Sequence, residues 1–137
     1  MDILLLEVAS TLYGIDRLCV RRVIDPRREP VEEEAEGRSA RYRGEQYRLV
    51  DIRRDLEGDG APAPEAGGRS YLLVDSEKEG SRLRYLLGID GARATVKLEG
   101  ERLYPIPPYI FAEKTDCFRG VFEYRGRLQL LFNEQCL

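Results

Sequence analysis

Short apolar segments of strand length recur along this chain, and turn residues separate one from the next. Ile3–Val8 is one such run, and Ser70–Asp75 and Arg82–Asp90 form two more around the turn at Glu77–Ser81. Phe118–Phe132 reads as a hairpin with Arg125-Gly126 at its turn. Together the segments predict about nine or ten short strands, little helix and frequent turns, which is typical of an all-β barrel or sandwich.

The tripeptide Tyr-Arg-Gly occurs twice, at residues 42–44 and 124–126, and an apolar stretch follows each copy. A duplicated half-barrel explains the repeat. Turn chemistry alone also explains it, because glycine adopts the backbone conformation that tight turns need. We interpret Arg125 as a turn residue. For Arg43, a plain surface arginine and a recognition residue both remain open.

Two segments predict irregular structure. Arg27–Arg41 is highly charged and is expected to be a solvated loop or a frayed turn. Residues 57–69 are rich in Gly, Ala and Pro, and we expect a mobile loop inside a single domain spanning residues 1–137, with a domain linker as the alternative. Asp51 is predicted to cap a short helix that runs through Leu56.

Composition excludes several kinds of chemistry. The chain has no histidine, so Ser-His-Asp and Cys-His nucleophile systems cannot exist. Three cysteines, Cys19, Cys117 and Cys136, lack the spacing of a zinc site and fit reduced thiols. A net charge of -3 gives no support for a nucleic-acid partner. We therefore predict a protein that is not an enzyme and that carries no metal or cofactor.

The N-terminal segment MDILLLEVAS has no basic stretch before its short apolar run, so it predicts a first strand and not a signal peptide. No apolar segment reaches transmembrane length. These features predict a cytoplasmic protein without direct membrane insertion. A chain of 137 residues buries roughly two-thirds of its unfolded surface, so it needs no disulfide or metal staple.

Arginine and aromatic residues are the candidate contact groups. All but three of the 22 basic residues are arginine, and planar guanidinium groups favour recognition surfaces. The segment Tyr104–Tyr109 is rich in proline and tyrosine, and it is either a contact surface or a loop covering a barrel end. Glu32–Glu36 is expected to be solvated, with a docking site for a basic partner as the alternative.

Four sequence blocks, in this order, resemble the CheW family, the adaptor proteins of bacterial chemosensory arrays. The blocks are Tyr13–Asp16 followed by Val20, Arg43-Gly44 followed by Leu49–Arg53, Gly88–Gly91, and Pro105–Pro107 followed by Phe118–Leu131. The resemblance implies two small, interlocked, five-stranded β-barrel subdomains of the SH3-like type around a shared core, with short helical turns. It also implies a non-enzymatic role.

The partners that the resemblance implies are the cytoplasmic tip of a chemoreceptor and the regulatory domain of a CheA-type histidine kinase. Arg43 matches the family's arginine associated with receptor coupling, and Val20 matches an apolar position on the receptor-facing side. Arg22, two residues after Val20, stands where the family usually has glutamate. Tyr109 falls near an aromatic position used in the second kinase contact.

Further departures from the family concern Glu29–Tyr42, which is acidic where the family is apolar and proline-rich, and Arg48, which replaces a proline. The leading hypothesis is a cytoplasmic adaptor at membrane-associated receptor arrays. The second is a divergent module that has lost receptor coupling and serves another two-component pathway. The third, from a different class, is a small β-barrel that binds a ligand or nucleic acid.

Overall fold

The computed structural model describes residues 1–34, 37–53, 69–99, 102–106 and 117–135, and these ranges contain twelve strands and one 3-10 turn. The elements of the first half are β1 (Asp2–Val8), β2 (Thr11–Asp16), η1 (Arg17–Cys19), β3 (Val20–Ile24), β4 (Val31–Glu33), β5 (Ser39–Tyr42) and β6 (Glu45–Asp51). Those of the second half are β7 (Ser70–Lys78), β8 (Ser81–Ile89), β9 (Gly91–Lys97), β10 (Leu103–Tyr104), β11 (Phe118–Tyr124) and β12 (Arg127–Phe132).

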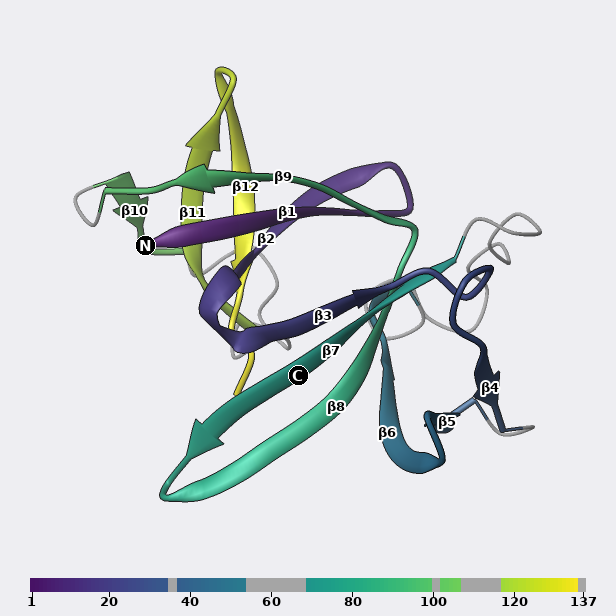
Figure 1. Cartoon of the computed structure of the whole chain (residues 1–137). Helices are drawn as coiled ribbons and strands as arrows, with labels where there is room; N and C mark the ends of the chain where they lie inside the picture. Colours follow the sequence, from purple (N-terminus) through teal and green to yellow (C-terminus); the bar gives the residue numbers. More distant parts are fainter. Residues whose placement is uncertain (35–36, 54–68, 100–101, 107–116, 136–137) are drawn as a thin grey trace.

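The strands form two curled sheets that exchange segments of the chain (Figure 1). The first sheet has the order β10-β11-β12-β2-β1-β9, and the second has the order β3-β7-β8-β6-β5-β4. The chain therefore starts in the first sheet, builds the second from β3 to β8, and returns to the first with β9. This confirms the all-β, two-unit architecture. Each sheet has six strands in the described residues where five were expected, because the short strands β10 and β4 extend the edges.

The two sheets repeat one topology. Reversed, the second sheet runs β4-β5-β6-β8-β7-β3, and each strand corresponds to its counterpart in the first sheet. Each sheet has one parallel pair of neighbouring strands, β12 with β2 in the first sheet and β6 with β8 in the second. Every other neighbouring pair is antiparallel. The matching order and direction support the duplicated half-barrel that the repeated tripeptide raised.

Both copies of the tripeptide form the same two-residue hairpin turn, one between β5 and β6 and one between β11 and β12. Arg43 and Gly44 have φ values of 49° and 79°, and Arg125 and Gly126 have 51° and 76°. Two successive left-handed residues give a turn whose twist matches that of the flanking strands. In each copy the arginine lies over the ring of the preceding tyrosine, at 5.5 Å and 5.3 Å from the ring centroid. Arg125 is therefore a turn residue, as predicted.

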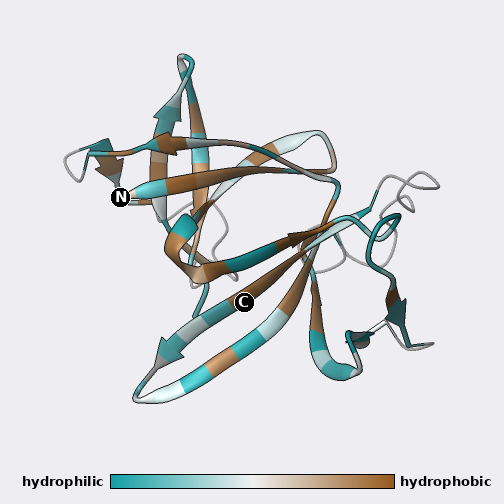
Figure 2. Cartoon of the chain, viewed as in Figure 1, coloured by the Kyte–Doolittle hydropathy of each residue, from teal (hydrophilic) through white to brown (hydrophobic). Residues whose placement is uncertain are grey.

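Apolar side chains gather in one core shared by the sheets and in one smaller core inside each sheet. This explains why β1 is apolar along its length. Leu4, Leu6 and Val8 belong to the shared core, whereas Ile3 and Leu5 belong to the core of the first sheet. Strand faces alternate, so both faces of β1 are buried. Figure 2 shows hydrophobic stretches where the strands cross and hydrophilic residues toward the tip of the β7–β8 hairpin.

The charged segment Arg27–Arg41 was predicted as a solvated loop or a frayed turn, and that prediction is wrong where β4 and β5 form. β4 pairs with β5 and β5 pairs with β6. Glu33 explains part of the difference, because its carboxylate accepts a hydrogen bond from the Tyr71 hydroxyl at 2.5 Å and pairs with Arg69 at 2.9 Å. These partners lie far along the chain, so the local pattern of charges does not reveal them.

Arg69 links three elements of the second sheet. Its guanidinium pairs with Glu33 and, at 2.9 Å, with Asp51, and it lies 5.6 Å from the centroid of the Tyr71 ring. Gly88 leaves room for it, since a Cβ there would lie 2.6 Å from Arg69 Nη2. Ile52 and Arg53 are helical, whereas the rest of the helix predicted after Asp51 lies outside the described residues, as does almost all of the predicted loop at 57–69.

Candidate partner-binding surface

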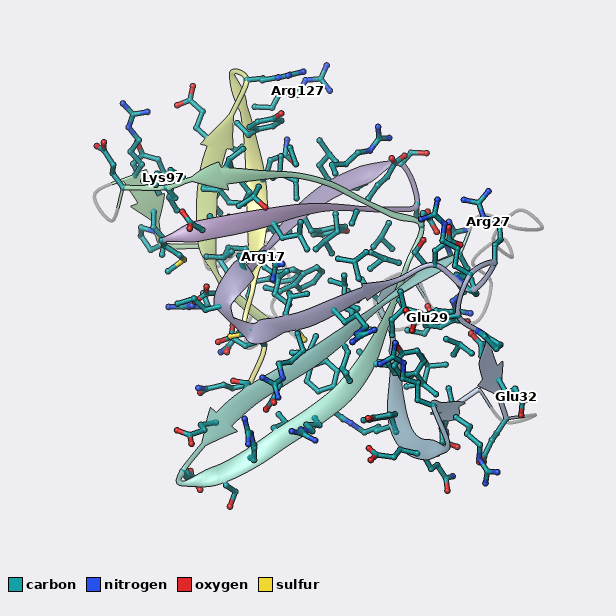
Figure 3. All side chains as sticks on the ribbon, viewed as in Figure 1. Arg17, Arg27, Glu29, Glu32, Lys97 and Arg127 are labelled. Atoms are coloured by element: carbon teal, nitrogen blue, oxygen red, sulfur yellow. The ribbon has the colours of Figure 1, made fainter. Side chains whose placement is uncertain are left out.

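Arg22 and Arg43, two residues predicted to face a partner, meet at a single carboxylate. Arg22 lies in β3, and its Nη1 is 3.2 Å from Glu29 Oε1. Arg43 lies in the β5–β6 turn, and its Nη2 is 3.2 Å from Glu29 Oε2. Figure 3 shows Glu29 where the chain passes from β3 toward β4. The curl of the second sheet thus brings together residues that are separate in sequence, and all three side chains keep part of their surface open to solvent.

A third group completes this contact. The Tyr42 hydroxyl donates a hydrogen bond to the Glu29 carboxylate. That hydrogen bond, followed by the charges of Arg43 and Arg22, holds the pKa of Glu29 below its ordinary value. Burial raises the pKa of Tyr42, so the phenol remains a neutral donor. At neutral pH the ionised Glu29 therefore offsets one of the two guanidinium charges, and the cluster keeps a net positive charge.

Val20, which was predicted to lie on the same contact side, has a different position. Its side chain is 4% exposed and belongs to the core shared by the two sheets. Val20 stands opposite Val74 in the β3–β7 ladder, whereas Arg22 stands opposite Leu73, which packs against the core of the second sheet. The register irregularity between Val20 and Arg22 turns these two side chains to different faces of β3. Val20 faces the shared core, and its buried side chain offers no contact surface in this structure.

Three further arginines surround one buried carboxylate nearby, and sequence reasoning missed them. The side chain of Asp75 is 6% exposed and lies 3.3 Å, 3.0 Å and 3.3 Å from guanidinium nitrogens of Arg21, Arg82 and Arg84. Asp75 stands directly opposite Arg84 in the β7–β8 ladder, and a register irregularity follows Val20 where Arg21 enters β3. The alternation of Arg82 and Arg84 in β8 was the available signal, because alternate residues share a face.

The predicted kinase-side residue, Tyr109, lies outside the described residues, as do residues 107–116 around it. The described start of that segment includes β10, which pairs with β11, and the Tyr104 side chain is exposed. Both interpretations of the proline-aromatic segment therefore remain predictions.

Cys19 lies in a partly buried acidic environment next to the C-terminal segment. Burial, followed by the charge and hydrogen bonding of Glu134, raises the pKa of the Cys19 thiol to about 12. Glu134 is itself buried, and its backbone carbonyl accepts a hydrogen bond from the Tyr85 hydroxyl at 2.7 Å. The Cys19 thiol is therefore protonated at neutral pH, as expected for an inert structural thiol.

This environment predicts slow alkylation of Cys19. In a variant carrying Cys117→Ser and Cys136→Ser, iodoacetamide at pH 8 should modify Cys19 at least about tenfold more slowly than a short unfolded peptide carrying the same thiol, because only the thiolate reacts. Mass spectrometry over time measures the rate. Adding Glu134→Gln should speed the reaction, and equal rates for the protein and the peptide would contradict the acidic environment.

The described residues contain no group of three or more Cys, Asp or Glu side chains placed to hold a metal ion. Within the same ranges, no helix has the length and apolar character needed to span a membrane.

Comparison with known proteins agrees with this architecture. The crystal structure of the scaffolding protein TtCheW from Thermoanaerobacter tengcongensis matches with a TM-score of 0.74 at 17% sequence identity, covering 96% of this chain and 83% of that chain. At this identity the likeness is one of fold. No curated protein matches the sequence. A model of the CheW-like domain matches residues 2–136. This chain therefore belongs to the CheW-like domain family, whose members are non-enzymatic scaffolds and adaptors of chemotaxis signalling.

Proposed function

We propose that this protein couples the cytoplasmic tip of a chemoreceptor to the regulatory domain of a CheA-type histidine kinase. The observation that carries the proposal is Arg43, whose guanidinium reaches the surface from the β5–β6 turn. Arg43 occupies the position of the family's receptor-coupling arginine, and its side chain is 56% exposed. Tyr109 is assigned to the kinase side. The complex forms in the cytoplasm, at membrane-associated receptor arrays, without a chemical step.

A second candidate is a divergent CheW-like module that binds the kinase but no receptor and serves another two-component pathway. The ion pair between Glu29 and Arg43 favours this candidate, because the arginine predicted to meet the receptor already has a carboxylate partner within the chain. Arg22 adds a second cation where the family usually carries an acid. Under this alternative Arg22 and Arg43 stay paired with Glu29, and the cluster binds no receptor.

Replacing Arg43 by alanine separates these roles. Arg43→Ala should leave the melting temperature within about 2 °C of wild type, because an exposed ion pair contributes little to stability. The same change should weaken binding of a receptor-tip fragment at least about tenfold, measured by isothermal titration calorimetry, while binding of the kinase regulatory domain stays unchanged.

Arg125→Ala is the matched control, since Arg125 has the same turn geometry and the same tyrosine contact in the other sheet. Both proteins should have the same stability, and Arg125→Ala should bind the receptor fragment normally. If the wild-type protein binds the kinase and shows no receptor binding, the second candidate function replaces the first.

A further inference from the structure

One face of the second sheet changes character along its strands. Leu73 and Leu86 stand opposite each other in the β7–β8 ladder and pack on the core of this sheet. Two residues nearer the hairpin tip, Asp75 stands opposite Arg84, and then Glu77 stands opposite Arg82. Side chains two apart in a strand share a face, so these charged residues continue the apolar face. The interior of the curled sheet thus ends in a charged rim.

This rim carries more positive than negative charge. The side chains of Arg21, Arg82 and Arg84 are 57%, 61% and 43% exposed, and all three contact the buried carboxylate of Asp75. Asp75 and Glu77, which stands opposite Arg82, offset two of the three guanidinium charges, so this part of the rim keeps one excess positive charge. Because the whole chain has a net charge of -3, the positive rim is a local feature and not a consequence of composition.

The rim lies beside the Arg22–Glu29–Arg43 cluster. Tyr47 connects the two parts, because it packs with Tyr42 on the core of the second sheet and its strand, β6, pairs with β8, where Arg84 lies. Tyr42 in turn contacts Glu29 and lies near Arg22 and Arg43. We define the arginine rim by its cations, which are Arg21, Arg22, Arg43, Arg82 and Arg84.

Glu29 fills part of this rim with a carboxylate from the chain itself. Its two oxygens contact Arg22 and Arg43, and its side chain is 35% exposed, so a carboxylate from another molecule can reach the same guanidinium groups if Glu29 moves aside. Asp75 differs, because its side chain is 6% exposed and stays with its arginines. Glu29 therefore acts as an exchangeable occupant, and Asp75 as a fixed one.

We propose that the arginine rim binds an acidic segment of the receptor-side partner and that Glu29 competes with that segment for Arg22 and Arg43. This rests on the proposed scaffold function and adds the chemistry of the partner's contact. Guanidinium groups match carboxylates in geometry as well as in charge. A protein segment with a few carboxylates fits better than a long nucleic acid, because Glu45 and Glu77 flank the rim and repel an extended polyanion.

Three variants test the proposal. Glu29→Gln keeps an acceptor for the Tyr42 hydroxyl but releases the charge of Arg22 and Arg43. Arg82→Gln and the double variant Arg82→Ala/Arg84→Ala remove cations from the other part of the rim. The control is Arg93→Ala, because Arg93 is 61% exposed like Arg82 and pairs with Glu7 in the first sheet. Urea unfolding confirms that each variant is folded.

Two probes are titrated at low and high salt: a receptor-tip fragment, by calorimetry, and a twelve-residue peptide of alternating Glu and Ala, by NMR. We expect Glu29→Gln to strengthen binding of both about threefold, the double variant to weaken it at least about tenfold, and Arg93→Ala to change nothing. The salt dependence should shrink with each arginine removed.

The outcomes separate the two proposals. If the receptor fragment binds and neither Glu29→Gln nor the arginine variants alter its affinity, the arginine rim is not the contact and the scaffold function stands. If the variants alter peptide binding but the receptor fragment does not bind, the arginine rim is a site for acidic segments and the receptor is not its partner. Tighter binding of a single-stranded oligonucleotide than of either acidic probe overturns the proposal in favour of nucleic acid.

Discussion

Phe132→Ala should lower the free energy of unfolding by about 3–5 kcal/mol. Phe132 is fully buried near the end of β12, in the core shared by the two sheets. Its ring packs against the rings of Tyr13 and Phe118, with centroid distances of 4.8 Å and 5.3 Å, and the three rings form one cluster. Alanine removes the ring and leaves a cavity among rigid strands that cannot close around it, so the cost combines lost burial with lost packing.

Urea unfolding followed by circular dichroism measures this loss, with Leu128→Ala as the control on the same strand. Leu128 is 68% exposed, so its truncation should change stability by about 0.5 kcal/mol or less. A difference below about 1 kcal/mol between the two variants would show that the end of β12 does not complete the shared core.

Gly14→Val should be similarly severe, with a loss of about 3 kcal/mol or more. A Cβ at Gly14 would lie 2.6 Å from Ile3 Cγ2 and 2.8 Å from Phe122 Cε1. Both neighbours are buried, so neither can move freely. Valine is a better strand former than glycine, and local propensity alone would therefore predict a gain in stability. The sign of the measured change decides between packing and propensity.

Gly91→Ala is the control for this effect. Gly91 lies in β9, and a Cβ there would meet no atom within 4 Å. Alanine should be neutral or slightly stabilising at Gly91, because it reduces the conformational freedom of the unfolded chain without a clash. Equal destabilisation by the two changes would mean that Gly14 is not closely packed. The urea midpoint of each variant provides the comparison.

The sequence predicted the strands whose two faces are both buried, because continuous apolar runs such as Ile3–Val8 are unusual in any other all-β element. It also predicted the β11–β12 hairpin, since Arg125-Gly126 supplies the left-handed residues that the turn requires. The resemblance to the CheW family supplied the two-unit arrangement, which local patterns alone left as a barrel or a sandwich.

The second sheet was harder to predict where charged residues build it. β4 forms in an acidic segment because Glu33 reaches Tyr71 and Arg69, and a contact over such a distance leaves no local pattern. Val20 was expected on the receptor-facing side because it matches an apolar family position there. In the ladder it stands opposite Val74 and is buried, and the irregularity between Val20 and Arg22, which no local pattern reveals, turns Arg22 to another face.

The sequence identified single residues of the candidate site but not how they meet in space. Arg22 and Arg43 were identified individually from motif positions, and the fold places them on one carboxylate. The cluster around Asp75 depends on the register of β7 against β8 and on the irregularity in β3, which the sequence does not specify. Arginine is so frequent in this chain that residue type alone did not distinguish Arg82 and Arg84 from ordinary surface residues.

Bridging of two partners is the central property of a scaffold, and one measurement tests it directly. A receptor-tip fragment is immobilised, and retention of the kinase regulatory domain is measured with and without this protein. The account predicts that the kinase domain is retained only when the wild-type protein is present, and that Arg43→Ala abolishes most of that retention. Equal retention of the kinase domain in the presence and absence of the protein would contradict the account.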